Sequence, residues 1–223
     1  MARTDSLRWR LVRPLFELLY TNRVLYWLAS TIPFAGRWRT WQRLVLPRLH
    51  GRDVLEVGCG PGTLLVDMLA AGYACAAVER SPQMAAAAGA RLRRSGYDPA
   101  LVRQGTVQRL PFPDAAFDDV VSTFPTDYIA DPRALAEISR VLRPGGRLIV
   151  VLGAALLPAN AVLWPFVVVQ RLVYGRQPRR GASDSAAEAP FLRLLASSGL
   201  TPTYERVRAP SWEAHLYLGE KTA

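Results

Sequence analysis

A glycine-rich turn constrains this chain more than any other feature. The segment LEVGCGPG, residues 55–62, places Gly58, Gly60 and Gly62 directly after a short apolar run. Because glycine has no Cβ, such a turn can be tight and its backbone can approach a ligand closely. A helix that begins after the turn directs its N–H groups at the same ligand. The pattern predicts a strand, a ligand-binding turn and a helix at the carboxyl edge of a parallel sheet.

The glycine spacing and two nearby carboxylates narrow the choice of ligand. A dinucleotide fingerprint would need glycine where Thr63 stands, and no phosphate-loop motif is present. Glu79 ends the second predicted strand, about 20 residues after the glycines, where it can accept hydrogen bonds from both hydroxyls of a ribose. Glu56 lies inside a buried strand, an unusual place for a carboxylate. An ammonium-bearing ligand would account for Glu56, and the alternative is an ion pair with a nearby Arg.

The hydrophobic periodicity alternates between strand and helix along most of the chain. Five strands are predicted at 53–57, 74–78, 100–103, 117–123 and 147–152. Helices between them are predicted at 63–71, 82–95 and 133–142. After a further helix, the last two predicted strands are antiparallel to each other, and these three elements occupy 190–198, 203–207 and 214–218. The alternation predicts a doubly wound α/β fold whose mostly parallel sheet is covered on both faces.

Two segments do not follow this alternation. Residues 1–49 are predicted as a helical arm, with helices at 7–30 and 37–49, so the sheet domain is expected to span 50–223. Residues 153–189 form a long insertion after the fifth strand. A compact domain seldom carries so long a connection unless it acts as a lid or a binding element. Both segments are expected to cap the carboxyl edge of the sheet, where ligands bind in such folds.

The composition argues against several classes of protein and site. Half of the residues are apolar, which supplies one core and argues against disorder. Cys59, Cys75, His50 and His215 show no metal-ligand spacing, so no metal site is expected. Two cysteines make no disulfide framework and no secretory signal is present, which favours a cytoplasmic setting. The most apolar piece, 156–169, has 14 residues and two prolines, too short to span a membrane.

Four motifs resemble those of class I S-adenosylmethionine-dependent methyltransferases. They occur in the order and at the spacing of that family, between residues 50 and 152, and read VLEVGCGPG, VERSPQM, LPFPDAAFDDVVS and RVLRPGGRLIVV. The resemblance is to the small-molecule group (the type 11-like methyltransferases), which includes enzymes that methylate quinones, sterols and phospholipids. It implies a Rossmann-like sheet of seven strands with the seventh antiparallel, and S-adenosylmethionine as the cofactor.

The resemblance also implies a set of cofactor contacts around the glycine turn. Glu56, Gly58 and Gly60 would line the methionine end of the cofactor. Glu79 would hold the ribose hydroxyls. Cys59, within the turn, is expected to be a small buried residue of this cofactor site.

Further contacts are implied at the ends of later strands. Arg80 and Met84 would lie near the adenine ring. The family commonly has Asp after the third strand, where this chain has Gly105 and then Thr106, so Thr106 or the backbone N–H of Val107 would take that place. At the end of the fourth strand, the residues that would face the methyl group and the acceptor are Ser122 and Thr123.

The implied chemistry asks little of the protein beyond positioning. Methyl transfer is an in-line displacement at a sulfonium, and the cofactor already carries the activated carbon. A general base is needed only where the acceptor must lose a proton. The candidates are Asp127 and Tyr128, just beyond the fourth strand; the alternative is that Asp127 caps a turn and Tyr128 packs. The segment STFPTDYI has no histidine, which argues against a histidine base.

The formal net charge of +10 is concentrated at the two ends of the chain. Residues 1–52 hold ten Arg against two acidic residues, together with four Trp, whereas residues 53–150 are nearly neutral. Residues 153–180 combine Trp164 and Phe166 with a run of Arg. Mixtures of Arg and Trp suit the inner face of an anionic membrane. The alternative is a lid over the acceptor with an ordinary solvated Arg face.

These observations predict S-adenosylmethionine-dependent methyl transfer to a small apolar acceptor, such as a lipid or an isoprenoid quinone. Two alternatives stay open: an O- or N-methyltransferase of soluble small metabolites, and a non-catalytic cofactor-binding module. A nucleic-acid partner is not expected, because the central segment carries no basic stripe and no known binding module. The sequence leaves the oligomeric state open.

Overall fold

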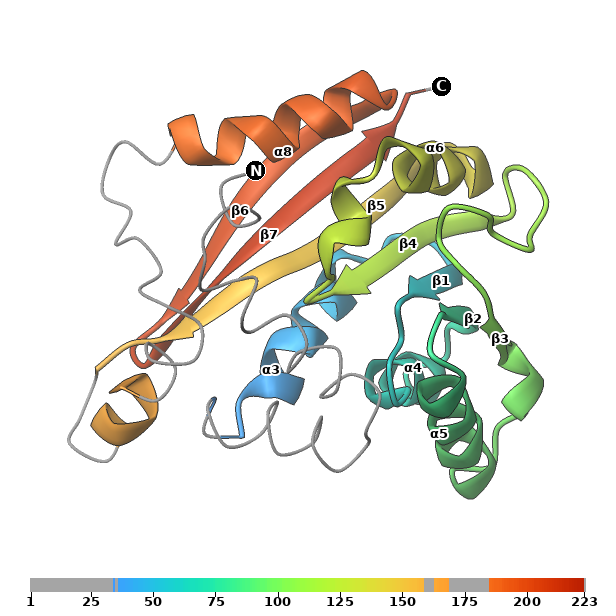
Figure 1. Cartoon of the computed structure of the whole chain (residues 1–223), viewed down its shortest axis with the longest axis horizontal. Helices are drawn as coiled ribbons and strands as arrows, with labels where there is room; N and C mark the ends of the chain where they lie inside the picture. Colours follow the sequence, from blue (N-terminus) through green and yellow to red (C-terminus); the bar gives the residue numbers. More distant parts are fainter. Residues whose placement is uncertain (1–33, 35, 159–162, 169–184, 223) are drawn as a thin grey trace.

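The computed structural model describes residues 34, 36–158, 163–168 and 185–222 (Figure 1). The predicted helix at 7–30 and much of the predicted insertion lie outside the described residues. The described part is built on a seven-stranded sheet with the order β3-β2-β1-β4-β5-β7-β6. Helices lie on both faces of this sheet, so the predicted doubly wound α/β fold is confirmed.

Five strands form the parallel part of the sheet. They are β1 (Asp53–Val57), β2 (Ala74–Glu79), β3 (Val102–Gln104), β4 (Phe117–Thr123) and β5 (Leu142–Leu156). All neighbouring pairs among them are parallel. The central strands β1 and β4 are almost wholly buried, as expected for a parallel sheet with helices on both faces.

Strand β5 is much longer than the predicted strand at 147–152. At its start the pairing with β4 shifts register between Phe117 and Asp119, so the Pro-Gly-Gly turn is absorbed as an irregularity of the strand. At its end β5 continues to Leu156, because β7 supplies backbone partners up to Trp212. Residues 153–156 therefore belong to the sheet, and the prediction that the insertion begins at 153 was wrong.

The last two strands form a hairpin at the other edge of the sheet. They are β6 (Leu200–Ala209) and β7 (Trp212–Lys221), which pair antiparallel with each other, and β7 is antiparallel to β5. Both strands are twice as long as the five-residue segments 203–207 and 214–218 that the sequence predicted. The antiparallel seventh strand is confirmed.

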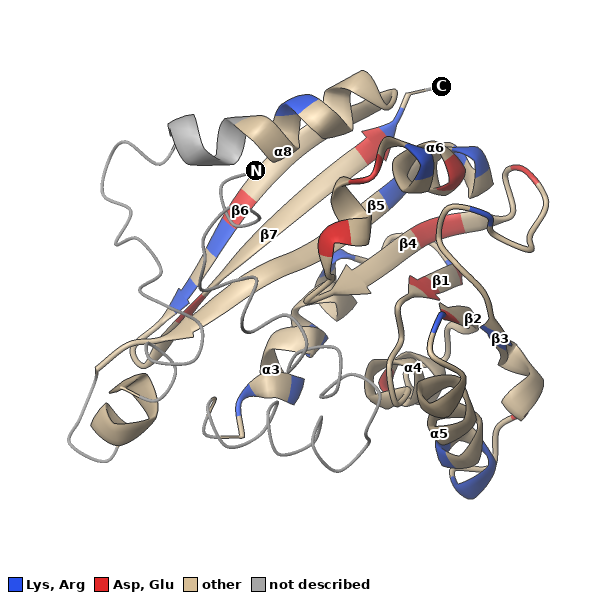
Figure 2. Cartoon of the chain, viewed as in Figure 1, with Lys and Arg blue, Asp and Glu red and all other residues tan. Residues whose placement is uncertain are grey.

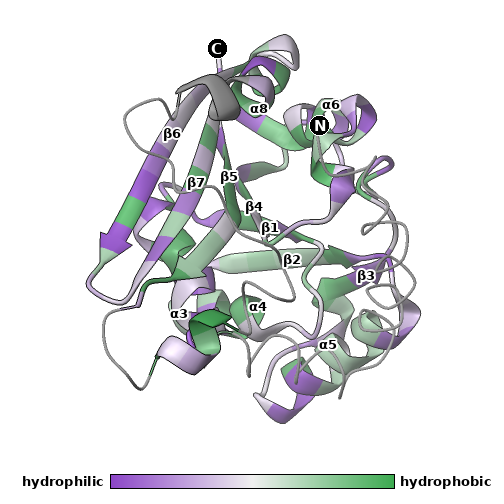
Figure 3. Ribbon diagram, turned by 60° about the vertical axis from the view of Figure 1, so that its left-hand side comes forward, coloured by the Kyte–Doolittle hydropathy of each residue, from purple (hydrophilic) through white to green (hydrophobic). Residues whose placement is uncertain are grey.

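Helices of two groups cover the two faces (Figures 1 and 3). Helices α4 (Thr63–Ala70) and α5 (Pro82–Arg94) bury apolar residues in one core with α3 (Trp38–Gln42). Helices α6 (Pro132–Val141) and α8 (Ser185–Ser197) contribute to the core on the opposite face. Helix α8 begins five residues before the predicted start at Pro190, which therefore lies inside the helix. Figure 3 shows that the central strands are apolar and that the edge strand β6 is largely hydrophilic.

The segment before β1 is anchored to the core by an ion-pair cluster. Its predicted single helix at 37–49 is two elements, α3 and the 3-10 helix η1 (Arg43–Arg48), in which Pro47 cannot donate an α-helical hydrogen bond. Arg39 and Arg43 both bind the buried carboxylate of Asp67 on α4, and Arg43 Nε lies 2.9 Å from Asp67 Oδ2. Burial alone would raise the pKa of Asp67, but the two guanidinium groups outweigh it and hold that pKa below its ordinary value.

Candidate functional site

The glycine turn directly follows β1, which is the strand at which the strand order reverses. The strands β2 and β3 lie on one side of β1, and β4 and β5 lie on the other. Ligands of doubly wound folds bind at this switch point, beyond the carboxyl ends of the strands. Gly58, Gly60 and Gly62 all have positive φ, at 69°, 53° and 72°. A Cβ on Gly58 would lie 2.4 Å from Tyr128 Oη, and one on Gly62 would lie 3.0 Å from the Cβ of Ala88. Both positions therefore require glycine for conformation and for space.

Glu79, at the end of β2, holds the glycine turn in place. Its Oε2 accepts a hydrogen bond from the backbone N–H of Gly60 at 2.9 Å, and its Oε1 accepts one from Ser81 at 2.8 Å. A carboxylate oxygen can accept more than one hydrogen bond, so this bracing leaves acceptor capacity for a ligand. The sequence predicted only the ribose contact of Glu79, which stays a prediction, and did not foresee the contact with the turn.

Glu56 is a buried carboxyl with no cationic partner among the described residues. Only 1% of it is exposed, and its Oε2 has no hydrogen-bond partner. Burial raises the pKa of Glu56 well above its ordinary value, and the nearby charges of Glu79 and Asp67 raise it further, whereas the backbone N–H of Leu65 lowers it. No Arg forms an ion pair with Glu56 within the described ranges, so the alternative reading of this residue finds no support there. The arrangement favours a cationic group placed against Oε2.

The remaining residues predicted around the cofactor lie on the β2 side of the turn or within it. Cys59 is buried as predicted, and burial, followed by Glu56 and Glu79, raises the pKa of its thiol. Met84 is buried near the start of α5, whereas Arg80 is exposed. After β3, Thr106 is exposed and Val107 is buried. Their contacts with an adenine ring stay predictions. Figure 2 shows acidic residues on β1, β2 and β4, while Arg residues gather at the far end of α5 and on β6.

The hydroxyl groups of Ser122 and Tyr128 lie against the end of β1, beside Gly58. Ser122 Oγ lies 2.8 Å from Tyr128 Oη, and both hydroxyls lie within hydrogen-bond distance of the carbonyl oxygen of Val57, at 3.2 and 3.1 Å. Burial raises the pKa of Tyr128 far above its usual range, so its phenol is neutral near pH 7. This environment opposes the general-base role predicted for Tyr128 and makes it a brace between β1 and β4. Asp127 is exposed at the start of η3 (Asp127–Ala130), and its role stays a prediction.

An aromatic cluster that the sequence did not predict lies beyond the carboxyl end of β4. Phe124 has a positive φ of 52°, which is strained for an aromatic residue. Its ring stacks on Trp38 at 4.0 Å between centroids and lies 6.2 Å from Trp41, which in turn contacts Trp212. Strained backbone gathers at functional positions because the surrounding structure has to impose it. The density of Trp before residue 50 was the sequence signal, and it left open whether these residues contact a membrane or form a lid over the acceptor.

Glu56 and Thr123 share one face of the sheet, and Ser122 points to the other. Glu56 pairs in register with Val121, and side chains alternate along a strand, so Thr123 lies on the same face as Glu56. The hydroxyl of Thr123 accepts a hydrogen bond from Gln42 Nε2 at 3.2 Å, which links α3 to the end of β4. The structure thus brings together Glu56, Glu79 and the glycine turn with the end of β4, as predicted from the strand order.

Comparison with known proteins agrees with this geometry. Residues 55–150 match the sequence profile of the family described as "Methyltransferase domain". A demethylmenaquinone methyltransferase of Symbiobacterium thermophilum is 36% identical over 146 residues, which cover 62% of this chain and 57% of that protein. The enzyme of the same name from Mycobacterium tuberculosis H37Rv is 36% identical over 56% of this chain and 52% of its own length. The chain thus matches a little over half the length of these relatives.

Solved structures show the same fold at low sequence identity. Geranyl diphosphate C-methyltransferase from Streptomyces coelicolor, solved with S-adenosylhomocysteine, has a TM-score of 0.60 at 17% identity and covers 87% of this chain and 84% of its own. A putative S-adenosylmethionine-dependent methyltransferase from Methanococcus maripaludis has a TM-score of 0.60 at 21% identity, over 87% and 89%. Residues 55–150, somewhat less than half of the chain, thus resemble a methyltransferase domain, and the solved structures share its α/β fold.

Proposed function

We propose that this chain binds S-adenosylmethionine at the glycine turn and methylates a small apolar acceptor of the quinone or lipid type. The observation that carries the proposal is the buried, unpaired Oε2 of Glu56 beside the turn. A cationic amino group is the partner that this carboxyl lacks, and the methionine end of the cofactor bears one. The cofactor supplies an activated methyl group when bound; the chain has to hold it, orient the acceptor and exclude water.

Each residue around the turn is proposed to bind a different part of the cofactor. Glu56 takes the amino group, and the backbone of Gly58 and Gly60 lies along the methionine portion. Glu79, which already braces the turn through Gly60, receives the ribose hydroxyls with its remaining lone pairs. At the adenine end, the contacts are proposed to come from Arg80, Met84, Thr106 and Val107. The burial of Met84 supports an apolar contact with the ring.

An apolar, planar acceptor fits the end of β4. The site there is lined by the aromatic cluster and carries the hydroxyl of Thr123 on the same face as Glu56. The related enzymes are named for demethylmenaquinone, and a protein of the same fold acts on geranyl diphosphate, so ring and isoprenoid chemistry both occur among the similar proteins. These names support a quinone-like acceptor with an isoprenoid chain for this protein.

Asp127 is the proposed proton acceptor among the described residues that follow β4. The raised pKa of Tyr128 argues against its acting as a base, and its hydrogen bonds support a role in holding Ser122 and the end of β1. The carboxylate of Asp127 is exposed one residue before Tyr128 and is the remaining candidate. It is required only where the acceptor atom must lose a proton.

We also propose that the protein takes its acceptor from an anionic membrane surface. Among the described residues, Trp164 is the exposed large apolar side chain, with 61% of its surface accessible. It belongs to a helical turn at 164–168 whose Val167 is buried in the core, so this turn is held against the body of the protein. A Trp held in this way suits the headgroup region. No helix in the described ranges is long and apolar enough to cross a membrane.

The arm at 1–49 and the segment after β5 are proposed to cap the acceptor. The cluster of Arg39, Arg43 and Asp67 supports this for the arm, since it fixes α3 against α4 beside the site.

Flotation with vesicles of phosphatidylglycerol tests the membrane contact. The wild type should float and Trp164→Ser should float less, with Trp212→Phe as a control for a buried Trp; equal flotation would contradict the role of Trp164.

Calorimetry and a methylation assay together test the proposed function. S-adenosylmethionine and S-adenosylhomocysteine should both bind, and radiolabelled methyl should pass to chemically reduced demethylmenaquinone but not to a panel of soluble amines and phenols. Binding with transfer only to soluble compounds would favour the soluble-metabolite alternative. Binding without any transfer would favour a non-catalytic module. Absence of binding would refute the proposal and both alternatives.

A further inference from the structure

Three buried polar atoms without a hydrogen-bond partner belong to one short helix in the segment that precedes the sheet. Within the described residues, four buried side-chain atoms lack a hydrogen-bond partner: Trp38 Nε1, Trp41 Nε1, Gln42 Oε1 and Glu56 Oε2. The last is the proposed partner of the cofactor, and the other three all belong to α3. Native proteins pair almost all of their buried polar groups. Three exceptions in one short helix therefore need an explanation, and a ligand that binds there supplies one.

These atoms lie next to the proposed site of methyl transfer. Gln42 is 7% exposed and Trp41 is fully buried. The amide nitrogen of Gln42 donates a hydrogen bond to Thr123 Oγ1. This bond holds the Gln42 side chain beside the end of β4, and the amide oxygen of Gln42 has no partner among the described residues. Thr123 lies on the same face of the sheet as Glu56, so the amide of Gln42 adjoins the site on the side of the cofactor.

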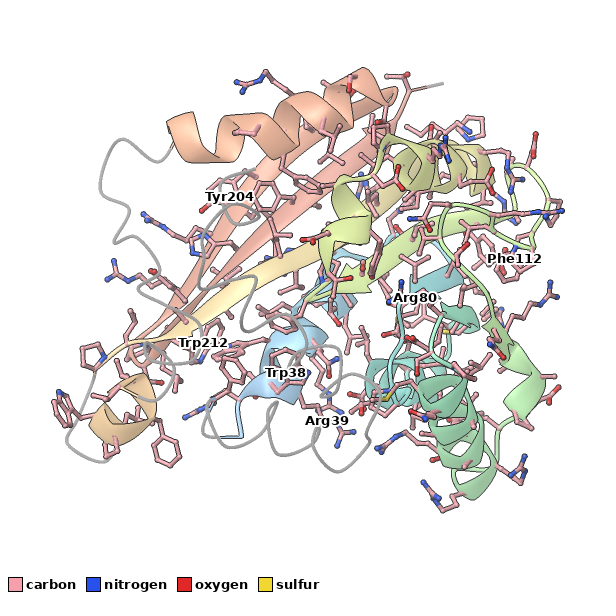
Figure 4. All side chains as sticks on the ribbon, viewed as in Figure 1. Trp38, Arg39, Arg80, Phe112, Tyr204 and Trp212 are labelled. Atoms are coloured by element: carbon pink, nitrogen blue, oxygen red, sulfur yellow. The ribbon has the colours of Figure 1, made fainter. Side chains whose placement is uncertain are left out.

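The same segment offers a flat apolar surface. Trp38 stacks on Phe124 with an angle of 28° between the rings, and Phe124 is held there in a left-handed backbone conformation. Figure 4 shows Trp38 on α3, close to the carboxyl end of β4. Stacked aromatic rings present a surface that another planar ring can join. Polar atoms at the edge of such a surface would bind substituents on the ring.

We infer that Trp38, Trp41 and Gln42 form the polar edge of the acceptor subsite, and that Gln42 selects acceptors whose ring carries a free hydroxyl group. The two indole N–H groups can only donate, and the amide oxygen of Gln42 can only accept. A ring hydroxyl does both, so it can pair with an N–H and with Gln42. A quinone carbonyl or an ether oxygen can only accept and would leave Gln42 unpaired. The inference rests on the proposed function and names the form of acceptor that this site takes.

The expected selectivity is large because Gln42 Oε1 is already unpaired in the free protein. The cost of removing this oxygen from water is therefore incurred before binding, and a new hydrogen bond is gained almost in full. Sites built to bind a hydroxyl group reject analogues that lack it far more strongly than apolar sites reject a missing methylene. We expect at least a tenfold preference for a hydroxylated ring over its methyl ether.

Calorimetry with two probes on the full chain, saturated with S-adenosylhomocysteine, tests the inference. The probes are 1-naphthol and 1-methoxynaphthalene, which share a ring system but differ in the hydroxyl proton. The wild type should bind 1-naphthol at least tenfold more tightly. Gln42→Leu should bring the ratio of the two dissociation constants close to one. Trp41→Phe should weaken both probes about fivefold and keep the ratio, because its N–H serves either oxygen.

Two substitutions distinguish the loss of a hydrogen-bonding group in the acceptor subsite from the loss of packing in the core. Trp212→Phe makes the same change in an adjacent aromatic ring whose nitrogen is not among the unpaired atoms, and it should leave the ratio unchanged. Both Trp→Phe changes leave a cavity and should lower the melting temperature to a similar extent, whereas only Trp41→Phe should weaken binding of the probes. If Gln42→Leu does not fold, Trp38→Phe and Trp41→Phe still test the donors.

The results separate this inference from the proposed function. Equal binding of the two probes by the wild type, or an unchanged preference in Gln42→Leu, would overturn the inference while S-adenosylhomocysteine still binds. Unchanged binding of both probes in Trp38→Phe and Trp41→Phe would overturn the part assigned to the indoles. Failure of S-adenosylhomocysteine to bind would instead refute the proposed function.

Discussion

The substitution Glu56→Gln tests two consequences of the burial of this carboxyl: lower stability near neutral pH and tighter binding of a cationic group. The pKa of Glu56 in the folded protein lies above its ordinary value, because burial and two nearby carboxylates oppose its charge. At a pH below the ordinary value both the folded and the unfolded protein hold the proton. As the pH rises toward the folded value, the unfolded chain loses its proton first, and stability is lost. The wild type is therefore destabilised near neutral pH by a carboxyl that has no cationic partner in the described part of the chain.

The amide of Gln has nearly the same shape and no charge to lose. We expect Glu56→Gln to raise the free energy of unfolding at pH 7 by on the order of 1–3 kcal/mol, which is the cost of a buried group without a partner. The same change should weaken binding of S-adenosylmethionine by about 10- to 150-fold, because a hydrogen bond to a charged group contributes about 1.5–3 kcal/mol. The substitution thus stabilises the free protein and weakens the complex.

Urea unfolding between pH 5 and pH 7, with calorimetry at the same values, measures both effects. The difference in stability between Glu56→Gln and the wild type should grow with pH. Glu220→Gln, which alters an exposed carboxylate paired with Arg147, is the matched control and should change stability by less than about 0.5 kcal/mol. A variant that is less stable than the wild type at pH 7 and binds S-adenosylmethionine equally well would refute the reasoning.

Three further substitutions test the rest of the site. Asp67→Asn leaves Arg39 and Arg43 without their anion and should cost on the order of 1–2 kcal/mol, since both guanidiniums are half-exposed. Because the folded pKa of Asp67 is lowered, this difference should be present in urea unfolding at neutral pH and shrink as the pH falls through that value; a constant difference would contradict it. Gly58→Ala introduces a Cβ at a positive φ, 2.4 Å from Tyr128 Oη, and should abolish cofactor binding in calorimetry; normal binding would show that the turn is not the cofactor site. Tyr128→Phe should lower kcat by less than about tenfold with an unchanged pH–rate profile, whereas loss of an ionisation from that profile would restore Tyr128 as a proton-transferring group.

Most of the parallel sheet follows from local pattern. The alternation of apolar strands and helices predicted β1, β2 and β4 within a residue of their observed bounds. The long strands were underestimated, because their ends are set by partners. Strand β5 runs to Leu156 only because β7 pairs with it, and the hairpin extends to Trp212 for the same reason. A strand without its partner has no backbone hydrogen bonds to define where it stops.

The candidate site was predictable where its residues are close in sequence. Gly58, Gly60 and Gly62 form one turn, and Glu56 and Glu79 lie at the ends of neighbouring parallel strands, so the strand order alone brings them together. The role of Tyr128 was not predictable in this way. Its hydroxyl reaches Val57, 71 residues earlier, and burial raises the pKa of the phenol far above its usual range.

The sequence by itself determined the fold class, the glycine turn and the two carboxylates of the cofactor site, because these depend on backbone conformation and on strand periodicity. Only the tertiary structure decided that Glu56 Oε2 has no partner and that Glu79 braces the turn. It also joined Gln42 to Thr123 across 81 residues of chain and left the amide oxygen unpaired. Such facts depend on which groups lose contact with water and which partners reach them, and no local pattern records either.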